Sequence, residues 1–500
     1  MKYLIIIGGL IICMSTMSCS KEFLNKTDPT RIGTELFFKD QVQVDQAVNG
    51  IYGQLQGITN TGYIFKEMMS DNTTLDFNPL DRGGAAGWEA FEFSTVNSGN
   101  GEISNLWNLY YSVMYNVNNT LGRLPASTIT DASKKQMDGE LKFLRALLYF
   151  DMVRYWGDVV LVTKTLETPD EAFNQLRVPQ AQVYAQIESD LKDAVAALPV
   201  KNASNYVGRA TKGSASALLG DVYLTEKKYT DAVAILNSML TLGYSLVPNY
   251  ADVFDPTKKN GPESVFEVQY QGGNDLGEQS SFMYTFAPRL SGAAITGYAN
   301  VTPGGRNIPT NDIIAAYEPG DLRKDVSVKT GYTATNGTFV PIPYVNKYHH
   351  THTIAGRTDD NWPVYRYSDV LLMLAESINE ATGPSSVALG YLNQVRARAG
   401  LAPLATLDKA AFKTKVLQER RVELAFENKR WFDLKRTMTP SELAAFMNAY
   451  GAKEKANPTV PRGGIAFNAL DYVYTDNEYF LPIPAPQILI NSKLSQNSGY

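Results

Sequence analysis

The sequence predicts a mainly α-helical protein, built as a tetratricopeptide-like helical scaffold with loop-rich excursions and a few short strands. Apolar residues recur at steps of three and four in many segments, which is the period of one helix face. One helix pair carries the spacing of a tetratricopeptide unit. Two long stretches without any period interrupt the helices. The 500-residue chain is 44% hydrophobic, which is enough for a large core.

The first residues are typical of an export signal. Lys2 is followed by an apolar run of ten residues, Leu4 to Cys13, whereas a membrane-spanning helix needs about 20 residues. Small residues then lead into Cys19, as in a bacterial lipoprotein signal that is cut just before a lipid-modified cysteine. We expect a lipoprotein signal peptide over residues 1–18 and a lipid anchor at Cys19. The alternative is an ordinary signal peptide with an incidental cysteine.

Cleavage before Cys19 would leave a mature chain with no second cysteine. A disulfide framework or a cysteine-based metal cluster within one chain is then excluded. Residues 19–38 are polar and interrupted by Pro29, so we expect an extended tether. The formal net charge is −5 and no basic block stands out, which argues against nucleic-acid binding.

Residues 39–242 form the predicted N-terminal helical region. Its helices are indicated by apolar faces that begin at Val44, Trp107, Leu141 and Tyr184. Gly157 is expected to end the third of these helices, and the VVLV that follows predicts a short buried strand.

The segment SALLGDVYLTEKKYTDAVAILNSML fits a tetratricopeptide unit. Gly220 and Ala232 are small enough to let two antiparallel helices approach closely, and Tyr223 and Leu236 would fill the space around them. A repeat-like helix pair is also expected from YRYSDVLLMLAESINE onward, where the spacing is about one residue off.

Two segments, Thr59–Gly101 and Gly243–Pro363, are rich in glycine and aromatic residues and show no period. We predict that both are irregular excursions, and long ordered loops in folded proteins are usually functional. Within the second segment, Val265–Tyr270 predicts a strand and Gly331–Asn346 predicts one or two hairpins.

Residues 243–500 form the predicted C-terminal region, in which a loop-rich, ligand-facing part precedes further helices. In the stretch ERRVELAFENKRWFDLKR, Arg420 and Glu423 lie three residues apart, as do Glu427 and Arg430. Opposite charges at that spacing meet on a helix surface. Near the end of the chain, three alternating prolines predict an extended run without a helix.

Two groups of residues contain side chains that can bind metal ions. His349, His350 and His352 lie close in sequence, and imidazole is a common zinc ligand, but a solvated hairpin is the more ordinary interpretation. The second group is rich in side-chain oxygens and consists of Asp71, Asn72, Asp76, Asn78 and Asp81. Calcium could bind such a group, but aspartate and asparagine in loops more often form turns. We predict no metal site and no cofactor.

The motifs of the common enzyme classes are missing. The chain has no Gly-x-Ser-x-Gly elbow, no phosphate-binding glycine loop before a helix and no His-Glu-x-x-His. Nothing singles out a pair of carboxylates for glycoside hydrolysis among the 51 acidic residues. We therefore predict that the protein is not an enzyme and has no catalytic residues.

Aromatic residues fall into two sets. Those on or beside helical apolar faces, Trp107, Tyr110, Tyr155 and Trp431, are expected in the core. Loop aromatics such as Tyr63 sit among polar residues instead, where a flat ring could stack on a sugar and charged groups could bind hydroxyls. The predicted ligand-binding residues are Asp71, Arg82, Trp88, Tyr284, Tyr298 and Arg306. The alternative is that these aromatics only hold the loops in place.

An ordered set of motifs resembles the SusD/RagB family. The resemblance begins at Cys19, which is followed by FL and Pro29, and covers nearly the whole mature chain. Its further motifs are WNLYYSVMYNVN, ELKFLRALLYFDMVRYWGDVVLV, YRYSDVLLMLAESINE, LNQVRARAGL, ERRVELAFENKRWFDLKR and the final LPIP.

The resemblance implies a nutrient-binding outer-membrane lipoprotein of Bacteroidetes, exposed on the cell surface and without enzymatic activity. Members of the family combine a helical scaffold with a loop-rich ligand face. They lie over a TonB-dependent transporter of the SusC type and capture oligomeric nutrients, most often glycans. We expect capture of an oligosaccharide or polysaccharide for such a transporter. Two alternatives are capture of peptides, and a lipid-anchored protein-interaction scaffold without a soluble ligand.

Overall fold

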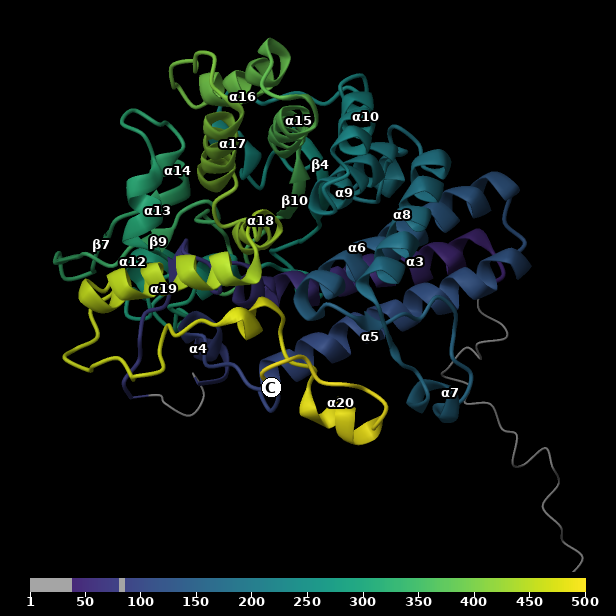
Figure 1. Cartoon of the computed structure of the whole chain (residues 1–500), viewed down its shortest axis with the longest axis horizontal. Coiled ribbons are helices and arrows are strands. Elements are labelled where there is room, and N and C mark those ends of the chain that lie inside the picture. Colours follow the sequence, from purple (N-terminus) through teal and green to yellow (C-terminus); the bar gives the residue numbers. More distant parts are fainter. Residues whose placement is uncertain (1–37, 81–85) are drawn as a thin grey trace, which may run out of the picture.

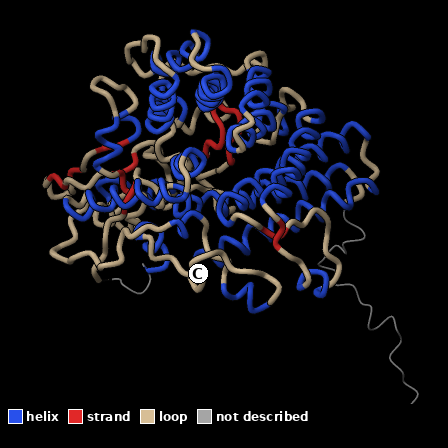
Figure 2. The backbone as a smooth tube through the Cα atoms, viewed as in Figure 1, coloured by secondary structure: helices blue, strands red, loops and turns tan. Residues whose placement is uncertain are grey.

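Helices build most of the frame, and the strands are short (Figures 1 and 2). The computed structural model describes residues 38–80 and 86–500. Its longer helices are α3 (Gln41–Lys66), α4 (Ala86–Phe93), α5 (Gly101–Arg123), α6 (Asp131–Trp156), α8 (Gln180–Ala197), α9 (Lys212–Thr225), α10 (Tyr229–Met239), α15 (Tyr367–Thr382), α16 (Ser386–Arg398), α17 (Lys409–Glu423), α18 (Arg430–Thr437) and α19 (Pro440–Ala456).

Short helices and two- to five-residue strands fill the connections. The short α-helices are α7 (Pro169–Phe173), α11 (Phe282–Phe286), α12 (Ala293–Thr296), α13 (Asn311–Ala316), α14 (Lys324–Ser327) and α20 (Ala485–Ile490). Single 3₁₀ turns are Leu124–Ala126, Ser204–Tyr206, Tyr250–Val253 and Asp476–Tyr479. The mainly α-helical class predicted from the sequence is confirmed.

Every strand pair in the described residues is antiparallel and two-stranded. The pairs are β1 (Thr73–Thr74) with β5 (Ile308–Pro309), β2 (Val159–Val160) with β3 (Arg177–Val178), β4 (Ser264–Val268) with β10 (Trp362–Arg366), β6 (Val328–Lys329) with β9 (Tyr344–Val345), and β7 (Tyr332–Thr333) with β8 (Phe339–Val340). The buried strand at VVLV, the strand at 265–270 and the hairpin within 331–346 are thereby confirmed.

The predicted tetratricopeptide-like pair is α9 and α10. Ala232 and Leu236 are completely buried between the two helices. A Cβ on Gly220 would lie 2.4 Å from Leu236 Cδ2, which is closer than van der Waals contact allows. The glycine therefore sets how near the helices pack, as the spacing predicted. The second expected pair also forms, as α15 and α16.

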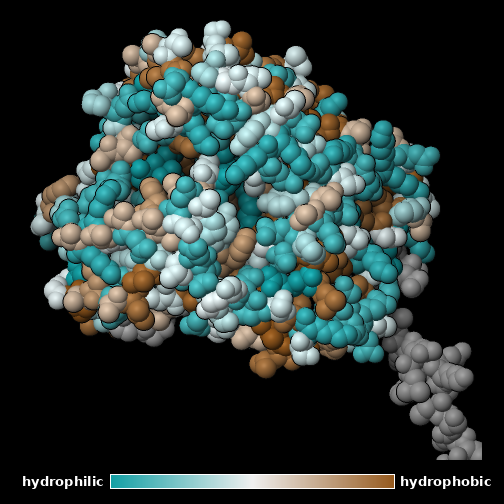
Figure 3. Space-filling view, in the orientation of Figure 1, coloured by the Kyte–Doolittle hydropathy of each residue, from teal (hydrophilic) through white to brown (hydrophobic). Residues whose placement is uncertain are grey.

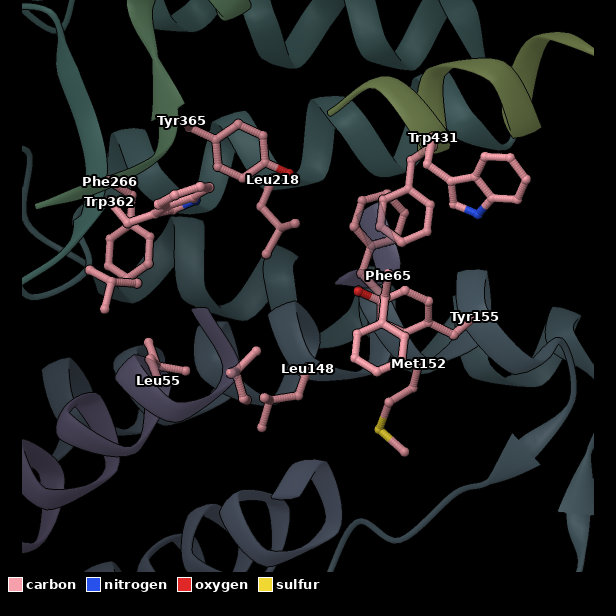
Figure 4. Packing of buried hydrophobic residues seen from close by; sticks show 14 of the residues in the cluster. Leu55, Phe65, Leu148, Met152, Tyr155, Leu218, Phe266, Trp362, Tyr365 and Trp431 are labelled. Carbon is pink, nitrogen blue, oxygen red and sulfur yellow. The ribbon is translucent and has the colours of Figure 1, made fainter. Parts of the chain in front are cut away.

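One continuous apolar core joins the helices to the strand pair β4–β10 (Figure 4). Phe65 from α3, Tyr155 from α6 and Trp431 from α18 meet there, and each is at most 2% exposed. The Phe65 and Tyr155 ring centroids lie 5.9 Å apart in an edge-to-face arrangement that aromatic pairs favour. The helical aromatics are core residues, as expected.

The prediction that Thr59–Gly101 is irregular throughout is wrong. Helix α3 continues to Lys66, and α4 occupies Ala86–Phe93. Tyr63, Ile64 and Phe65 are all buried, so the end of α3 is apolar on several sides and has no single-face period. Because consecutive residues are buried, the apolar residues do not recur at steps of three and four, and the sequence pattern does not predict this part of the helix.

The charge pairs predicted along one helix surface are also wrong. Helix α17 ends at Glu423, and the chain turns through Phe426 and Asn428, whose φ angles are +65° and +64°. Arg420 instead binds Asp369 (2.6 Å) and Asp433 (3.0 Å) in the interior. The turn removes the helical register on which the local pairing depended.

The three alternating prolines do not exclude a helix. Residues 481–484 are extended, but α20 begins at Ala485 with Pro486 in its first turn. Proline is tolerated there because the first amides of a helix have no acceptor within it.

The N-terminal predictions fall outside this part of the chain. The signal peptide, Cys19 and the tether up to residue 37 are not among the described residues. Within the described residues, no helix is both long and apolar enough to cross a bilayer. The boundary between residues 242 and 243 stays a prediction.

Candidate ligand-binding face

Segments far apart in the sequence meet at one loop-built face. Ser280 and Thr358 exchange two backbone hydrogen bonds of 3.0 and 2.9 Å, which hold the segment after His352 beside α11. On the other side of α11, the amide of Gly304 donates to the Tyr284 carbonyl at 2.8 Å, and the amide of Arg306 donates to the Thr285 carbonyl at 3.1 Å. The loop that carries Tyr298 and Arg306 is thus fixed to α11 through its backbone.

Two glycines make this close approach possible. A Cβ on Gly304 would lie 2.6 Å from the Thr285 carbonyl oxygen. Gly305 has φ of +63°, and a Cβ there would lie 2.9 Å from Asp76 Cβ. A side chain at either position would clash or strain the backbone. The sequence GG at 304–305 therefore sets the position of Arg306.

The first aromatic group on this face combines Arg306, Tyr63 and Trp88. Arg306 Nη1 donates a hydrogen bond of 2.9 Å to the Tyr63 hydroxyl, and the guanidinium carbon lies 4.5 Å from the Trp88 ring centroid. Burial raises the pKa of Tyr63, and the nearby Arg306 partly offsets that rise. Trp88 is only 9% exposed because the guanidinium and its neighbours cover the ring. Arg306 itself is half-buried.

The second aromatic group is built around His352. Its Nδ1 lies 3.2 Å from the His350 carbonyl oxygen, so Nδ1 carries the proton and Nε2 accepts from the Tyr284 hydroxyl at 2.5 Å. The Tyr298 hydroxyl donates to the His352 carbonyl at 3.0 Å, and the two rings lie 5.1 Å apart. Tyr284 is 8% exposed, and burial raises its pKa. Tyr298 is half-buried and presents more of its ring.

Asp71 lies apart from these groups, in the interior. It is 1% exposed, and its carboxylate accepts from Arg430 Nε at 2.8 Å and lies 2.8 Å from Arg421 Nη2. The two arginines hold the pKa of Asp71 below its ordinary value despite burial. In this place Asp71 joins α17 and α18 to the end of α3, which is a structural role. Its contact with ligand stays a prediction without support.

Two predicted residues of the loop before α4, Arg82 and Asp81, lie outside the described residues. Contact of Arg82 with a ligand stays a prediction.

The three histidines do not form a metal site. Their imidazole rings contact different partners: His349 contacts the Ile295 carbonyl, His350 contacts Asp360 and His352 contacts Tyr284. Among residues 38–80 and 86–500, no group of three or more histidine, cysteine, aspartate or glutamate side chains is arranged to hold a metal ion.

Sequence reasoning missed the role of His352 as the centre of the second aromatic group. It considered the histidine only as a metal ligand. The composition carries a signal for this role. The chain has only 3 His but 29 Tyr, and an imidazole ring can both donate and accept hydrogen bonds. A histidine in a tyrosine-rich loop region is therefore a candidate to bind tyrosine hydroxyls.

An apolar groove lies on the scaffold, away from the loop-built face. This groove of about 610 Å³ runs between α5, α7 and α20, where Tyr115, Phe173 and Ile490 are exposed. Figure 3 shows apolar residues gathered at the lower edge of the molecule, over α20. None of the predicted ligand-binding residues within the described part of the chain lines this groove. On the loop-built face, by contrast, Tyr298 is half-buried, while Trp88 and Tyr284 are nearly covered.

A helical frame that carries aromatic residues on a loop-built face is typical of a binding protein. Residues 22–224 match a family model described as starch-binding and associating with the outer membrane, and residues 298–500 match the model of the SusD family. The chain belongs to the SusD/RagB family. The resemblance inferred from the ordered motifs is confirmed.

Individual relatives agree with this assignment over nearly the full length. A SusD-like protein of Formosa agariphila, P2, is 26% identical over 528 aligned residues, covering 98% of each chain. The crystal structure of a SusD superfamily protein from Parabacteroides distasonis superposes with a TM-score of 0.77 at 25% identity, covering 94% of this chain and all of that one. A laminarin-binding SusD-like protein gives a TM-score of 0.76 at 25% identity, with 93% and 100% coverage.

Proposed function

We propose that this protein is a cell-surface lipoprotein, anchored through Cys19, that captures an oligosaccharide on its loop-built face. It then delivers the ligand to a TonB-dependent outer-membrane transporter of the SusC type. It does so by binding alone, without catalysis. The observation that carries the proposal is the convergence of Trp88, Arg306, Tyr284 and Tyr298 from three separate segments onto one face.

The chemistry of that face suits a sugar. The partly open Tyr298 ring can stack on the C–H face of a pyranose, and the half-buried Arg306 guanidinium can donate to hydroxyl oxygens. Trp88 is nearly covered, so we assign it the task of supporting Arg306 through the 4.5 Å ring contact. Similarity to a laminarin-binding SusD-like protein makes a β-glucan the first ligand to test.

Calorimetry with the mature chain tests the capture of glycans. We expect saturable binding of laminarin or another glycan from a panel that also includes starch. Tyr298→Ala should weaken that binding by up to about tenfold, since an aromatic contact contributes roughly 0.5–1.5 kcal/mol beyond the area it buries. Tyr115→Ala, which removes an exposed ring on α5, is the matched control and should leave affinity unchanged.

Two results would redirect the proposal. Binding of protein digests with no response to any glycan would favour peptide capture. Unchanged affinity in both Tyr298→Ala and Arg306→Ala would mean that the glycan binds elsewhere. Delivery and anchoring are tested separately: copurification with a large β-barrel tests the partner, and fatty-acid labelling lost in Cys19→Ala tests the anchor.

A further inference from the structure

A second pocket lies on the scaffold, between α8, α18, the start of α19 and the 3₁₀ turn at Asp476–Tyr479. Its volume is about 460 Å³. It shares no lining residue with the loop-built face. The side chains that matter for the argument are Tyr184, Phe432, Lys435, Tyr479 and Phe480.

Lys435 is the unusual member of this pocket. It is 5% exposed, and its ammonium group donates to the Arg154 carbonyl at 2.5 Å. Nζ lies 4.5 Å from the Tyr479 ring centroid and 4.6 Å from that of Phe480. No carboxylate among the described residues lies within ion-pair distance of it. Burial, and next the positive charge of Arg154, lower the pKa of Lys435 well below its ordinary value.

A second buried lysine, Lys347, has the carboxylate partner that Lys435 lacks. Lys347 is 1% exposed, and its ammonium group lies 2.6 Å from Glu427 Oε1. A buried charge is normally neutralised in this way, because an unpaired ion in the interior carries a large desolvation cost. Lys435 has a carbonyl and two ring faces, but no anion.

Both arginines that line the pocket, and Glu226 on its rim, are already engaged. Arg154 binds Asp151 at 2.7 Å, and Arg436 binds Asp433 at 2.7 Å. On the rim, Glu226 lies 3.1 Å from Lys228 Nζ.

The rim of the pocket carries charges of both signs. Lys227 lines the pocket and is exposed. Glu442 also lines it and caps the start of α19: its carboxylate accepts from the Thr439 amide at 2.8 Å and offsets the partial positive charge of the helix end. An anion that passes the rim would meet Lys435, which has no carboxylate partner among the described residues.

We propose that this pocket binds an oxyanion, a carboxylate or sulfate group of a small ligand, with Lys435 as its charge partner. The aromatic walls exclude water on two sides of the ammonium group, which strengthens its attraction for an anion. The bound anion would keep Lys435 protonated and replace the missing internal carboxylate. The site is independent of the glycan-binding face and does not rest on the proposed function.

Titration calorimetry at low ionic strength tests the proposal with three probes: sulfate, glucuronate and glucose. We expect saturable binding of sulfate, glucuronate or both, and none of glucose. Binding of sulfate alone would identify a free inorganic anion as the ligand, and binding of glucuronate would identify an acidic sugar. Lys435→Met, which keeps the length of the side chain and removes its charge, should weaken anion binding at least tenfold. Lys201→Met removes an exposed lysine elsewhere and should have no effect.

A measurement on the wild-type protein keeps the test decisive if Lys435→Met fails to fold. With ¹³C-labelled lysine, the Lys435 ε-carbon should titrate at a lower pH than exposed lysines such as Lys201, and saturating anion should raise the Lys435 pKa. No saturable anion binding, equal binding in Lys435→Met, or a Lys435 pKa that anions leave unchanged would each overturn the proposal.

Discussion

Two arginines show how the scaffold differs from the loop-built face. Arg366, in the scaffold, is 1% exposed and donates to Glu263, Glu423 and Glu427 at distances of 2.7–2.9 Å. Arg306, on the loop-built face, is half-buried and donates to one tyrosine, and its Nε has no hydrogen-bond partner among the described residues. Three carboxylates neutralise the scaffold arginine, whereas Arg306 has no ion-pair partner among the described residues. The difference in charge pairing, and the partial exposure of Arg306, separate the two arginines.

Removing the scaffold arginine should give the largest effect on stability. Arg366→Met leaves three buried carboxylates without their shared partner, so we expect a loss of about 3–5 kcal/mol in the free energy of unfolding. Urea denaturation of the mature chain measures it. Lys192→Met, which removes an exposed ion pair with Glu188, should cost less than about 1 kcal/mol. Equal losses in the two variants would contradict the division between internal and surface charges.

A buried carboxyl group in the scaffold should make stability depend on pH. Glu67 is fully buried, accepts from the Asn428 amide at 2.6 Å, and has its pKa raised from 4.5 to about 8, mainly by burial. Because the folded pKa is the higher one, this contribution to stability is complete below pH 4.5 and is lost as the pH rises toward 8.

Glu67→Gln stays neutral and should not show that loss. Thermal unfolding at pH 5 and pH 8.5 compares the two proteins, and the variant should gain roughly 3–4 kcal/mol relative to wild type between these values. Glu442→Gln, at an exposed helix cap, is the control for general pH effects. Melting temperatures that stay parallel for wild type and Glu67→Gln would show that Glu67 is ionised in the folded protein.

The smallest effect is expected on the loop-built face. Tyr298→Phe removes one hydroxyl that donates to the His352 carbonyl, at a half-buried position, so we expect a loss of about 0.5–1 kcal/mol. Tyr348→Phe removes a comparable bond to the Phe426 carbonyl inside the scaffold, where Tyr348 is 1% exposed, and should cost more. Chemical denaturation of both variants measures the difference, and a larger loss in Tyr298→Phe would reverse the comparison.

Local pattern was enough to predict much of the scaffold. The α9–α10 pair follows from the spacing of Gly220, Ala232 and Leu236, because close packing of two helices depends on small residues at fixed intervals. Pairings that depend on distant segments were not predictable. Arg420 binds Asp369, 51 residues away, and the turn at Phe426 and Asn428 has no signature of glycine or proline.

The loop-built face was predicted by residue type and not by arrangement. Tyr284, Tyr298 and Arg306 were selected because aromatic and cationic residues in loops suit ligands. Which of them meet depends on backbone hydrogen bonds between 284–287 and 304–306, and no periodic pattern encodes these bonds. Asp71 was selected on the same grounds, yet two arginines from the C-terminal helices hold it in the interior.

The backbone bonds that attach Gly304 and Arg306 to α11 use amides and carbonyls only. Such bonds tolerate exchange of the neighbouring side chains, provided that the two glycines are retained. The face is therefore suited to rapid diversification: a loop from a relative, grafted between Ala287 and Gly304, should transfer ligand preference while the helices keep their packing. Evolution and protein engineering would then act on the same short segment.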